Sequence, residues 1–246
     1  MSTMVPALSA VVTFHREGLF AHAALRSYLQ SRAHARQAGM EVEVLLVLDN
    51  ADAETAAIVR NHPDLLGDEV IIQASVGDSA LARNLGLAQA RGIHACTLDG
   101  DDLISREYFQ RHLALAAQLP EHTILHAEMV VNFGRDNFVS WQLDQRTMPF
   151  SADMLISENP WVSAVFARRE VFTAVPYVAC HPQQTGFGYE DWHWSCQTIA
   201  AGYEHRVVPG TAYFYRLKQA GSVNATSSAL QAVMPPSDLF GRWEEA

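Results

Sequence analysis

The chain has 246 residues, of which 49% are hydrophobic and 18% are charged, which is enough to bury one sizeable core. Its 27 Asp and Glu outnumber its 17 Lys and Arg, and a net charge of −10 argues against a nucleic-acid partner, which needs a basic surface. No apolar run approaches the about 20 residues that span a bilayer, and the N-terminus lacks a secretory leader pattern. An odd count of three cysteines fits a reducing compartment. We therefore expect a cytoplasmic protein without a transmembrane segment, with peripheral association to the inner face of a membrane left open.

The first half of the chain alternates apolar, β-rich runs with longer helical patterns, which predicts βα units around a largely parallel sheet. The predicted strands are 8–14, 42–48, 69–74 and 93–98. The predicted helices are 19–38, 53–61 and 79–90. Each strand is nearly continuous in apolar residues, as expected where helices cover both faces of a sheet.

The second half is less regular. Its predicted strands are 124–133, 138–141, 161–167 and 211–217, and a helical pattern runs from about 190 to 201. Beyond Gly221, Ser, Asn, Thr and Pro dominate. This composition predicts a mobile lid or a disordered tail.

A cluster of carboxylates, Asp99, Asp101 and Asp102 around Gly100, follows the fourth predicted strand. Ligands of parallel sheets bind beyond the carboxyl ends of the strands, and carboxylates on one turn repel each other unless a cation neutralises them. This chemistry suits Mn²⁺ or Mg²⁺ held by one or two carboxylates, with water and substrate phosphates as the other ligands. A polar turn that caps a helix beginning near Ser105 is the alternative use of the same residues.

A second acidic pair, Glu190 and Asp191, follows a Gly-rich approach and opens a helical pattern. The N-terminus of a helix stabilises ionised carboxylates, which suits a general base that must be deprotonated before it accepts a proton. Charge complementarity with the helix dipole is the alternative explanation. His193 and Trp194 lie in the same helical pattern, where solvent-facing positions explain them as well as a role at the site does.

Motifs that occur in order between residues 8 and 216 resemble those of the family 2 glycosyltransferases, which have a GT-A fold. They are VVTFHR at 11–16, VLDN at 47–50, ALARNLG at 80–86 with ARG at 90–92, LDGDD at 98–102, and GYEDW at 188–192. The resemblance implies an α/β GT-A fold, with a Rossmann-like, mostly parallel central sheet flanked by helices and a smaller mixed-sheet acceptor-side region. It implies one domain with a nucleotide-sugar-binding half at about 8–103, an acceptor-binding half at about 104–217, and a flexible C-terminal lid or tail at 218–246.

The resemblance also implies roles on the donor side. Asp49 would accept the imide N–H of a uracil-like base, and Arg83 would lie near the base or the diphosphate. Asp101 would ligate a divalent ion that bridges the phosphates, and Asp99 would contact the ribose and lie beside the ion. The implied nucleotide-binding set is Thr13, His15, Arg16, Asp49, Arg83, Asp99 and Gly100.

On the acceptor side, the resemblance makes Asp191 the base that takes the proton of the attacking hydroxyl. Glu190 would orient the acceptor or support the loop, although the sequence does not separate the two carboxylates. The implied function is an inverting, metal-dependent transfer from a nucleotide diphosphate donor, a UDP-sugar, to a saccharide or lipid-linked acceptor. The implied context is saccharide or glycoconjugate biosynthesis.

Two features depart from the family pattern. Asn50 follows Asp49 where relatives commonly carry a second acid and then Gly-Ser, which leaves the nucleoside contacts open. Processive relatives carry QxxRW and membrane helices, whereas residues 239–243 read LFGRW, without the Gln. A transferase that adds a single sugar is therefore expected.

Two other functions remain as alternatives. A sugar nucleotidyltransferase would need a Gly-rich, basic phosphate loop after the first strand, and residues 13–18 (TFHREG) do not form one. A catalytically degenerate sugar- or nucleotide-binding module would not need to keep both acidic sites. A nicotinamide dehydrogenase is disfavoured because no GxGxxG follows the first strand.

Overall fold

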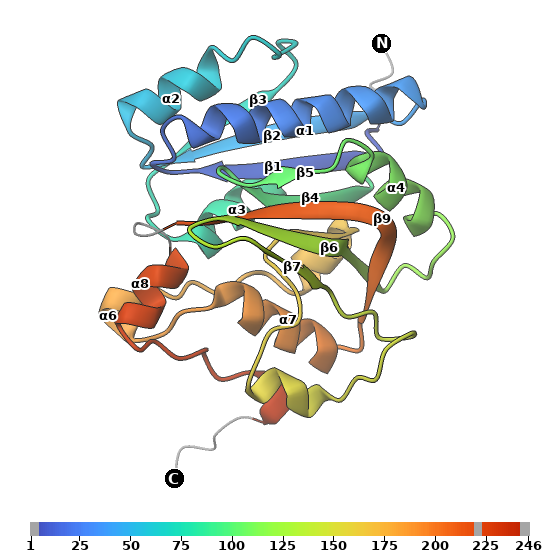
Figure 1. Cartoon of the computed structure of the whole chain (residues 1–246), viewed down its shortest axis with the longest axis vertical. Helices are drawn as coiled ribbons and strands as arrows, with labels where there is room; N and C mark the ends of the chain where they lie inside the picture. Colours follow the sequence, from blue (N-terminus) through green and yellow to red (C-terminus); the bar gives the residue numbers. More distant parts are fainter. Residues whose placement is uncertain (1–4, 219–222, 242–246) are drawn as a thin grey trace.

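A computed structural model describes residues 5–218 and 223–241, with the backbone alone for 223–225. Its described strands form a single mixed sheet with helices on both faces (Figure 1). The strands are β1 (Leu8–Phe14), β2 (Val42–Asp49), β3 (Val70–Ala74), β4 (His94–Asp99), β5 (Leu103–Ile104), β6 (Thr123–Gly134), β7 (Phe138–Trp141), β8 (Val165–Arg168) and β9 (Glu204–Leu217). Their order is β3-β2-β1-β4-β8-β6-β9-β5, and β7 pairs with β6.

The helices lie between these strands. They are α1 (Phe20–Gln37), α2 (Ala53–Arg60), α3 (Ser79–Gln89), α4 (Tyr108–Ala116), α5 (Arg169–Ala174), α6 (Pro182–Thr185), α7 (Glu190–Ala200) and α8 (Val223–Ala229), with short 3-10 turns at Ala152–Ile156 and Asp238–Phe240. Within the described part of the chain, no helix is long and apolar enough to cross a membrane.

Two hydrophobic layers enclose the sheet. One face packs on α1, α2 and α4, with the fully buried Tyr28 and Phe109 at its centre. The other face packs on α3, α5 and α7, where Trp194 stacks on Phe172 and Tyr177. Close approach of α3 to the sheet requires Gly86, because a Cβ at this position would lie 2.3 Å from Val11 Cγ1. The glycine of the ALARNLG motif is thus explained by packing.

The βα units of the first half are confirmed, and their boundaries lie within one residue of the predicted ones. β1 pairs in parallel with β2 and β4, and β2 pairs in parallel with β3. The carboxyl ends of these strands therefore meet at one edge of the sheet. Thr13, Asp49 and Asp99 lie there, in the last positions of β1, β2 and β4 or next to them.

The second half continues the same sheet with mixed pairing. β8 runs antiparallel to β4, whereas β6 and β9 pair in parallel. The strand predicted at 161–167 begins only at Val165, because Trp161 belongs to a loop in which its side chain is buried. The last strand is longer than predicted and begins at Glu204. Of the explanations for His193 and Trp194, solvent-facing positions are excluded, because only 3% and 1% of their surfaces are exposed.

The C-terminal segment lies along the start and one face of α7. Gly188 N donates to Val233 O, and His193 contacts Pro236 O through its Nε2 at 3.2 Å. α8 lies beside α6 in Figure 1, and a Cβ on Gly188 would meet Ser227 Oγ at 2.6 Å. Described residues of the predicted lid or tail are thus packed against the acidic GYEDW loop. Arg242 and Trp243 of the LFGRW segment lie outside the described residues.

Candidate active site

A cavity of about 790 Å³ opens between the carboxyl edge of β1, β2 and β4 and the start of α7. It brings together nearly all the residues that the sequence singled out. Those that line it are Thr13, His15, Asp49, Arg83, Asp99, Gly100, Asp101, Glu190 and Asp191. Arg16 is the exception, since its side chain is exposed and it is not among the lining residues.

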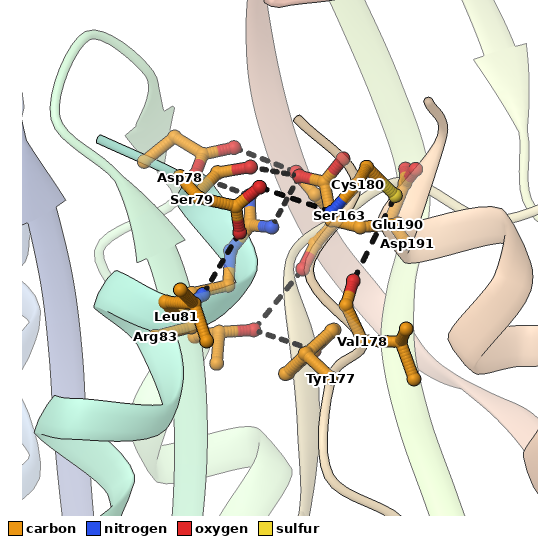
Figure 2. A network of polar contacts seen from close by, with 12 residues as sticks. Asp78, Ser79, Leu81, Arg83, Ser163, Tyr177, Val178, Cys180, Glu190 and Asp191 are labelled. Atoms are coloured by element: carbon orange, nitrogen blue, oxygen red, sulfur yellow. Dashed lines mark hydrogen bonds and ion pairs between the residues drawn. The ribbon is translucent and has the colours of Figure 1, made fainter. Parts of the chain in front are cut away.

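Arg83 links the two acidic motifs, and Figure 2 shows it beside Glu190 and Ser79. Its guanidinium, 4% exposed, donates to Asp99 Oδ1 at 2.8 Å and to Glu190 Oε1 at 2.7 Å. Glu190 Oε1 also accepts from Ser79 Oγ at 2.5 Å, and Asp99 Oδ2 accepts from Ser163 Oγ at 2.7 Å. The single positive charge of Arg83 offsets one of the two negative charges, and the hydroxyls of Ser79 and Ser163 hydrogen-bond to the carboxylates, which lowers the cost of burying them.

The two carboxylates of the EDW motif have different surroundings. Glu190 is buried and already accepts from Arg83 and Ser79. Asp191 is only partly buried and lines the cavity. Burial, and then repulsion from Glu190, raises the pKa of Asp191 to about 6. A carboxylate with this pKa is a stronger base than an ordinary aspartate and is still mostly ionised at neutral pH.

The carboxylates of the LDGDD turn also separate into different roles. Asp102 is 1% exposed and accepts from Tyr213 Oη at 2.7 Å and from Arg216 N at 2.6 Å, so it fastens the turn to β9. Tyr28 Oη holds the other side of the turn by donating to Asp99 O at 2.6 Å. Asp101 lines the cavity and pairs with Lys218 Nζ at 2.8 Å.

The carboxylate oxygens at this turn suit a cation that takes only some of its ligands from the protein. Among the described residues, no three His, Cys, Asp or Glu side chains converge as a ligand set. Asp101 has the cationic Lys218 as its partner, so positive charge is accommodated at this position. Both oxygens of Asp99 accept from Arg83 or Ser163, so Asp101 is better placed than Asp99 to hold an ion. Mn²⁺ or Mg²⁺ here would complete its coordination with water and phosphate oxygens.

Asp49 has backbone partners that the sequence did not reveal. Its Oδ1 accepts from Val76 N at 2.7 Å, and its Oδ2 accepts from Gly77 N at 3.0 Å. The carboxylate therefore orders the loop after β3. Oδ1 also accepts from Gly77 N at 3.2 Å and from Asn50 Nδ2 at 3.4 Å, whereas among the described residues Oδ2 accepts only from Gly77 N. A carboxylate offers about four acceptor positions, two on each oxygen, so capacity for a base N–H remains on Oδ2. His15 Nδ1 lies 2.7 Å from Asp49 O, which places the imidazole beside this carboxylate.

Gly100 is required by packing against β1. A Cβ at this position would lie 2.4 Å from Phe14 Cδ1 and 2.7 Å from Thr13 O. The absence of a side chain lets the acidic turn sit directly on the end of β1. Gly100 also lines the cavity, so its expected place beside the nucleotide is compatible with this packing.

Three residues that order the site are outside the set of site residues predicted from the sequence. Asp78 caps α3 by accepting from Leu81 N, and its Oδ2 accepts from Cys180 N at 3.0 Å. Ser163 and Lys218 hold the carboxylates of Asp99 and Asp101. The cap pattern at Asp78 is readable from a sequence. The partners of Ser163 and Lys218 come from distant segments and carry no local signal.

Comparison with known proteins agrees with this geometry. The sequence pattern of Glycosyl transferase family 2 matches residues 9–172, which is more than half of the chain. The chain belongs to glycosyl transferase family 2. The match covers the nucleotide-side motifs and the acidic turn of this family 2 chain. The Glu190–Asp191 pair lies beyond the matched segment.

Individual relatives are more distant. The uncharacterized glycosyltransferase EpsJ of Bacillus subtilis (strain 168) is 29% identical over 108 residues, which cover 44% of this chain and 30% of EpsJ. A structure of S. aureus TarS 1-349 is similar with a TM-score of 0.61 and 17% identity, covering 85% of this chain and 60% of that one. The mannosyltransferase PcManGT of Pyrobaculum calidifontis, in complex with GDP-Man and Mn²⁺, has a TM-score of 0.59, 17% identity and coverages of 89% and 59%.

These likenesses confirm the predicted GT-A fold. The family 2 chain spans less than two thirds of each of these three relatives. Another structure of TarS 1-349, with a TM-score of 0.60, is a complex with UDP-GlcNAc. Nucleotide sugars with different bases are thus bound by proteins of this fold.

Proposed function

We propose that this family 2 chain transfers a sugar from a nucleoside diphosphate donor, a UDP-sugar, to an acceptor hydroxyl with inversion at the anomeric carbon. The observation that carries the proposal is the pair of acidic groups on one cavity. Asp101 offers a carboxylate that is already paired with a cationic side chain, and Asp191 offers a carboxylate whose pKa, raised to about 6, suits a base. Arg83 fixes the distance between the two motifs by binding Asp99 and Glu190.

The donor would occupy the end of the cavity formed by β1, β2 and β4. Thr13, His15 and Asp49 lie there around the expected nucleoside. The remaining acceptor capacity of Asp49 favours a base with an N–H, such as uracil, over a base that presents only a lone pair. Arg16 is exposed outside the cavity, and we therefore remove it from the proposed nucleotide contacts.

The transfer step forms one bond, breaks another and moves one proton. The acceptor oxygen attacks the anomeric carbon from the face opposite the diphosphate, and the bond between that carbon and the diphosphate oxygen breaks. The leaving diphosphate keeps the electron pair of this bond, and Asp191 takes the hydroxyl proton. Attack from the opposite face inverts the configuration. Glu190 positions Asp191 through its bonds to Arg83 and Ser79.

A divalent ion at Asp101, with Asp99 beside it, would neutralise the charge that develops on the departing diphosphate. Lys218 and Arg216 lie at the same turn, where Arg216 Nε donates to Asp101 O at 2.9 Å. These two side chains add fixed positive charge for the phosphates. The acceptor proposed here is a saccharide, either free or linked to a lipid.

The first test is a calorimetric titration of UDP, with and without Mn²⁺, into the wild-type protein and Asp101→Ala. We expect binding that requires both the metal and Asp101. Asp136→Ala is the control, because Asp136 lies in an exposed surface pair with Arg135. Absence of metal-dependent binding for UDP, dTDP and GDP alike would reject the donor site and favour the degenerate module.

The second test measures turnover. Hydrolysis of UDP-sugars, scored by released UDP, requires no identified acceptor, and Asp191→Asn should lower it by about 10²- to 10⁴-fold while leaving UDP affinity unchanged. Normal turnover in Asp191→Asn would exclude Asp191 as the base. Product stereochemistry, measured by NMR on the released or transferred sugar, tests inversion.

A further inference from the structure

The cavity extends beyond the donor end along β6, β7 and β9. Its lining residues on these strands include Val130, Asn132, Phe138, Ser140 and Tyr215. The mechanism above gives none of them a role. β7 lies beside β6 on the side toward α7 in the view of Figure 1. These strand residues and Asp191 line the same cavity.

The strand register explains why these side chains share one face. Asn132 on β6 lies opposite Phe138 on β7 and opposite Tyr215 on β9. Residues directly opposite each other point to the same face of a sheet, and alternate residues along a strand do the same. Phe138, Asn132 and Tyr215 thus form one row across three strands, which we term the aromatic–amide row. Ser140 lies in the adjacent row and accepts from Asn132 Nδ2 at 3.4 Å.

Phe138 is the exposed member of this row, whereas Asn132 is only 7% exposed. Phe138 has 53% of its surface exposed although it lines a concave wall. An exposed ring next to a hydrogen-bonding amide and hydroxyl provides an apolar surface with polar groups at its edge. A pyranose has the complementary pattern, with a C–H face and a rim of hydroxyls. Trp161 also lines the cavity, but it is only 3% exposed and donates to Leu143 O.

Charge defines the class of sugar. Among the described residues that line the cavity, the carboxylates are Glu17, Asp49, Asp78, Asp99, Asp101, Asp102, Glu190 and Asp191, and the cationic side chains are Arg83, Arg216 and Lys218. All three of these cations contact the carboxylate or the backbone of Asp99 or Asp101. The aromatic–amide row has no ionisable carboxylate or cation. An anionic acceptor would meet an acidic cavity without a counter-ion of its own.

We propose that the aromatic–amide row is the acceptor subsite and that it selects an uncharged sugar residue. The C–H face of the sugar packs on Phe138, and its hydroxyls bond to Asn132 and Ser140, while the attacking hydroxyl faces Asp191. This inference rests on the proposed function, since it names the acceptor class of the same site.

The test uses matched neutral and acidic probes. The neutral probes are the methyl glycosides of glucose, galactose, mannose and N-acetylglucosamine, and the acidic probes are the methyl glycosides of glucuronic and galacturonic acid. Binding is measured by saturation-transfer NMR in the presence of Mn²⁺ and UDP, and again without them. We expect at least one neutral glycoside to bind, with saturation strongest on its C–H face, and its matched uronide to bind at least tenfold more weakly.

The variants separate a binding role from a structural one. Phe138→Ala and Asn132→Ala should each weaken the neutral glycoside by about tenfold without changing UDP affinity. Trp141→Ala is the matched control, because Trp141 is an aromatic residue on the same strand, 64% exposed, and outside the cavity lining. Thermal melting of each variant identifies any loss of folding.

The outcomes distinguish the two proposals. Three results would overturn the acceptor subsite while UDP–Mn²⁺ binding stays intact and the donor site stands. They are that no neutral glycoside binds, that a uronide binds equally well, or that Phe138→Ala behaves as Trp141→Ala does. If the wild-type protein does not bind UDP and Mn²⁺, the proposed function is overturned instead. Glycoside binding that still depends on Phe138 in that case would support the row as a sugar site.

Discussion

Arg83 and Glu190 are joined by a 2.7 Å ion pair across 107 residues of sequence. The pair fixes the first turn of α7 to α3, and so fixes Asp191 relative to the nucleotide edge of the sheet. Because both groups are buried, the geometry is protected from competition by water. Precise placement of the base relative to the donor is a major source of rate enhancement in group transfer.

Arg83→Met should strongly destabilise the protein. Removal of the guanidinium leaves Asp99 and Glu190 without their shared cation, and breaking a buried ion pair in this way costs about 3–5 kcal/mol. Urea denaturation measures the change in the free energy of unfolding. Arg83→Lys keeps the positive charge, so its free energy of unfolding should fall by less than that of Arg83→Met.

The control for this experiment is Arg135→Met. Its partner, Asp136, is exposed, and such surface pairs contribute about 0–1 kcal/mol. Equal destabilisation by Arg83→Met and Arg135→Met would show that the buried network does not hold the site together.

The pH dependence of UDP-sugar hydrolysis should report Asp191. Its pKa is raised to about 6, by burial first and by Glu190 second, so the base is protonated below this pH. Turnover should therefore rise with pH, reach half of its maximum near pH 6 and level off about one pH unit higher. Glu190→Gln removes the neighbouring negative charge, which lowers the pKa of Asp191 and moves the rising limb to lower pH. A limb that moves to higher pH in Glu190→Gln would contradict this assignment.

Lys218→Met should strengthen Mn²⁺ binding in the absence of nucleotide. The ammonium of Lys218 lies 2.8 Å from Asp101 Oδ2 and competes with an ion for the same carboxylate. The gain should be about threefold, because a partly exposed pair is weak. Mn²⁺ electron paramagnetic resonance measures the free ion directly. Arg146→Met, which breaks a pair with Glu204 outside the cavity lining, should leave the affinity for Mn²⁺ unchanged.

Stability should fall in acid because of a buried histidine pair. His126 Nε2 lies 2.9 Å from His205 Nδ1, and His205 Nε2 lies 2.9 Å from Thr198 Oγ1. Burial lowers the pKa of His126 from 6.5 to about 3, so the unfolded chain binds more protons between these values. The free energy of unfolding contributed by His126 is therefore lost as pH falls from 6.5 towards 3, at up to about 1.4 kcal/mol per pH unit.

His126→Asn should make the stability less dependent on pH in this range, even if its stability at pH 7 is lower. Chemical denaturation at several pH values gives the slope. His122→Asn, at an exposed position nearby in sequence, should keep the slope of the wild-type protein. An unchanged slope in His126→Asn would mean that other groups cause the acid sensitivity.

The apolar runs of the first half were sufficient to predict β1 to β4 and the helices between them, because buried parallel strands and their crossover helices are defined by local hydrophobic patterns. The order of polar residues at the strand ends then placed Thr13, Asp49 and Asp99 at one edge. The loop at 161–164, where the pattern predicts the start of a strand, could not be predicted in this way. The burial of His193 could not be predicted either. In both cases contacts with distant segments override the local pattern.

The sequence alone determined the family, the fold and the edge of the sheet at which ligands are expected, since these follow from local periodicity and ordered motifs. Only the tertiary structure decided how the carboxylates divide their work. Asp102 bonds to Tyr213, Glu190 bonds to Arg83, and Asp101 pairs with Lys218. These carboxylates acquire different partners and burial because segments far apart in the chain meet at the cavity, and local sequence does not record which distant segments meet.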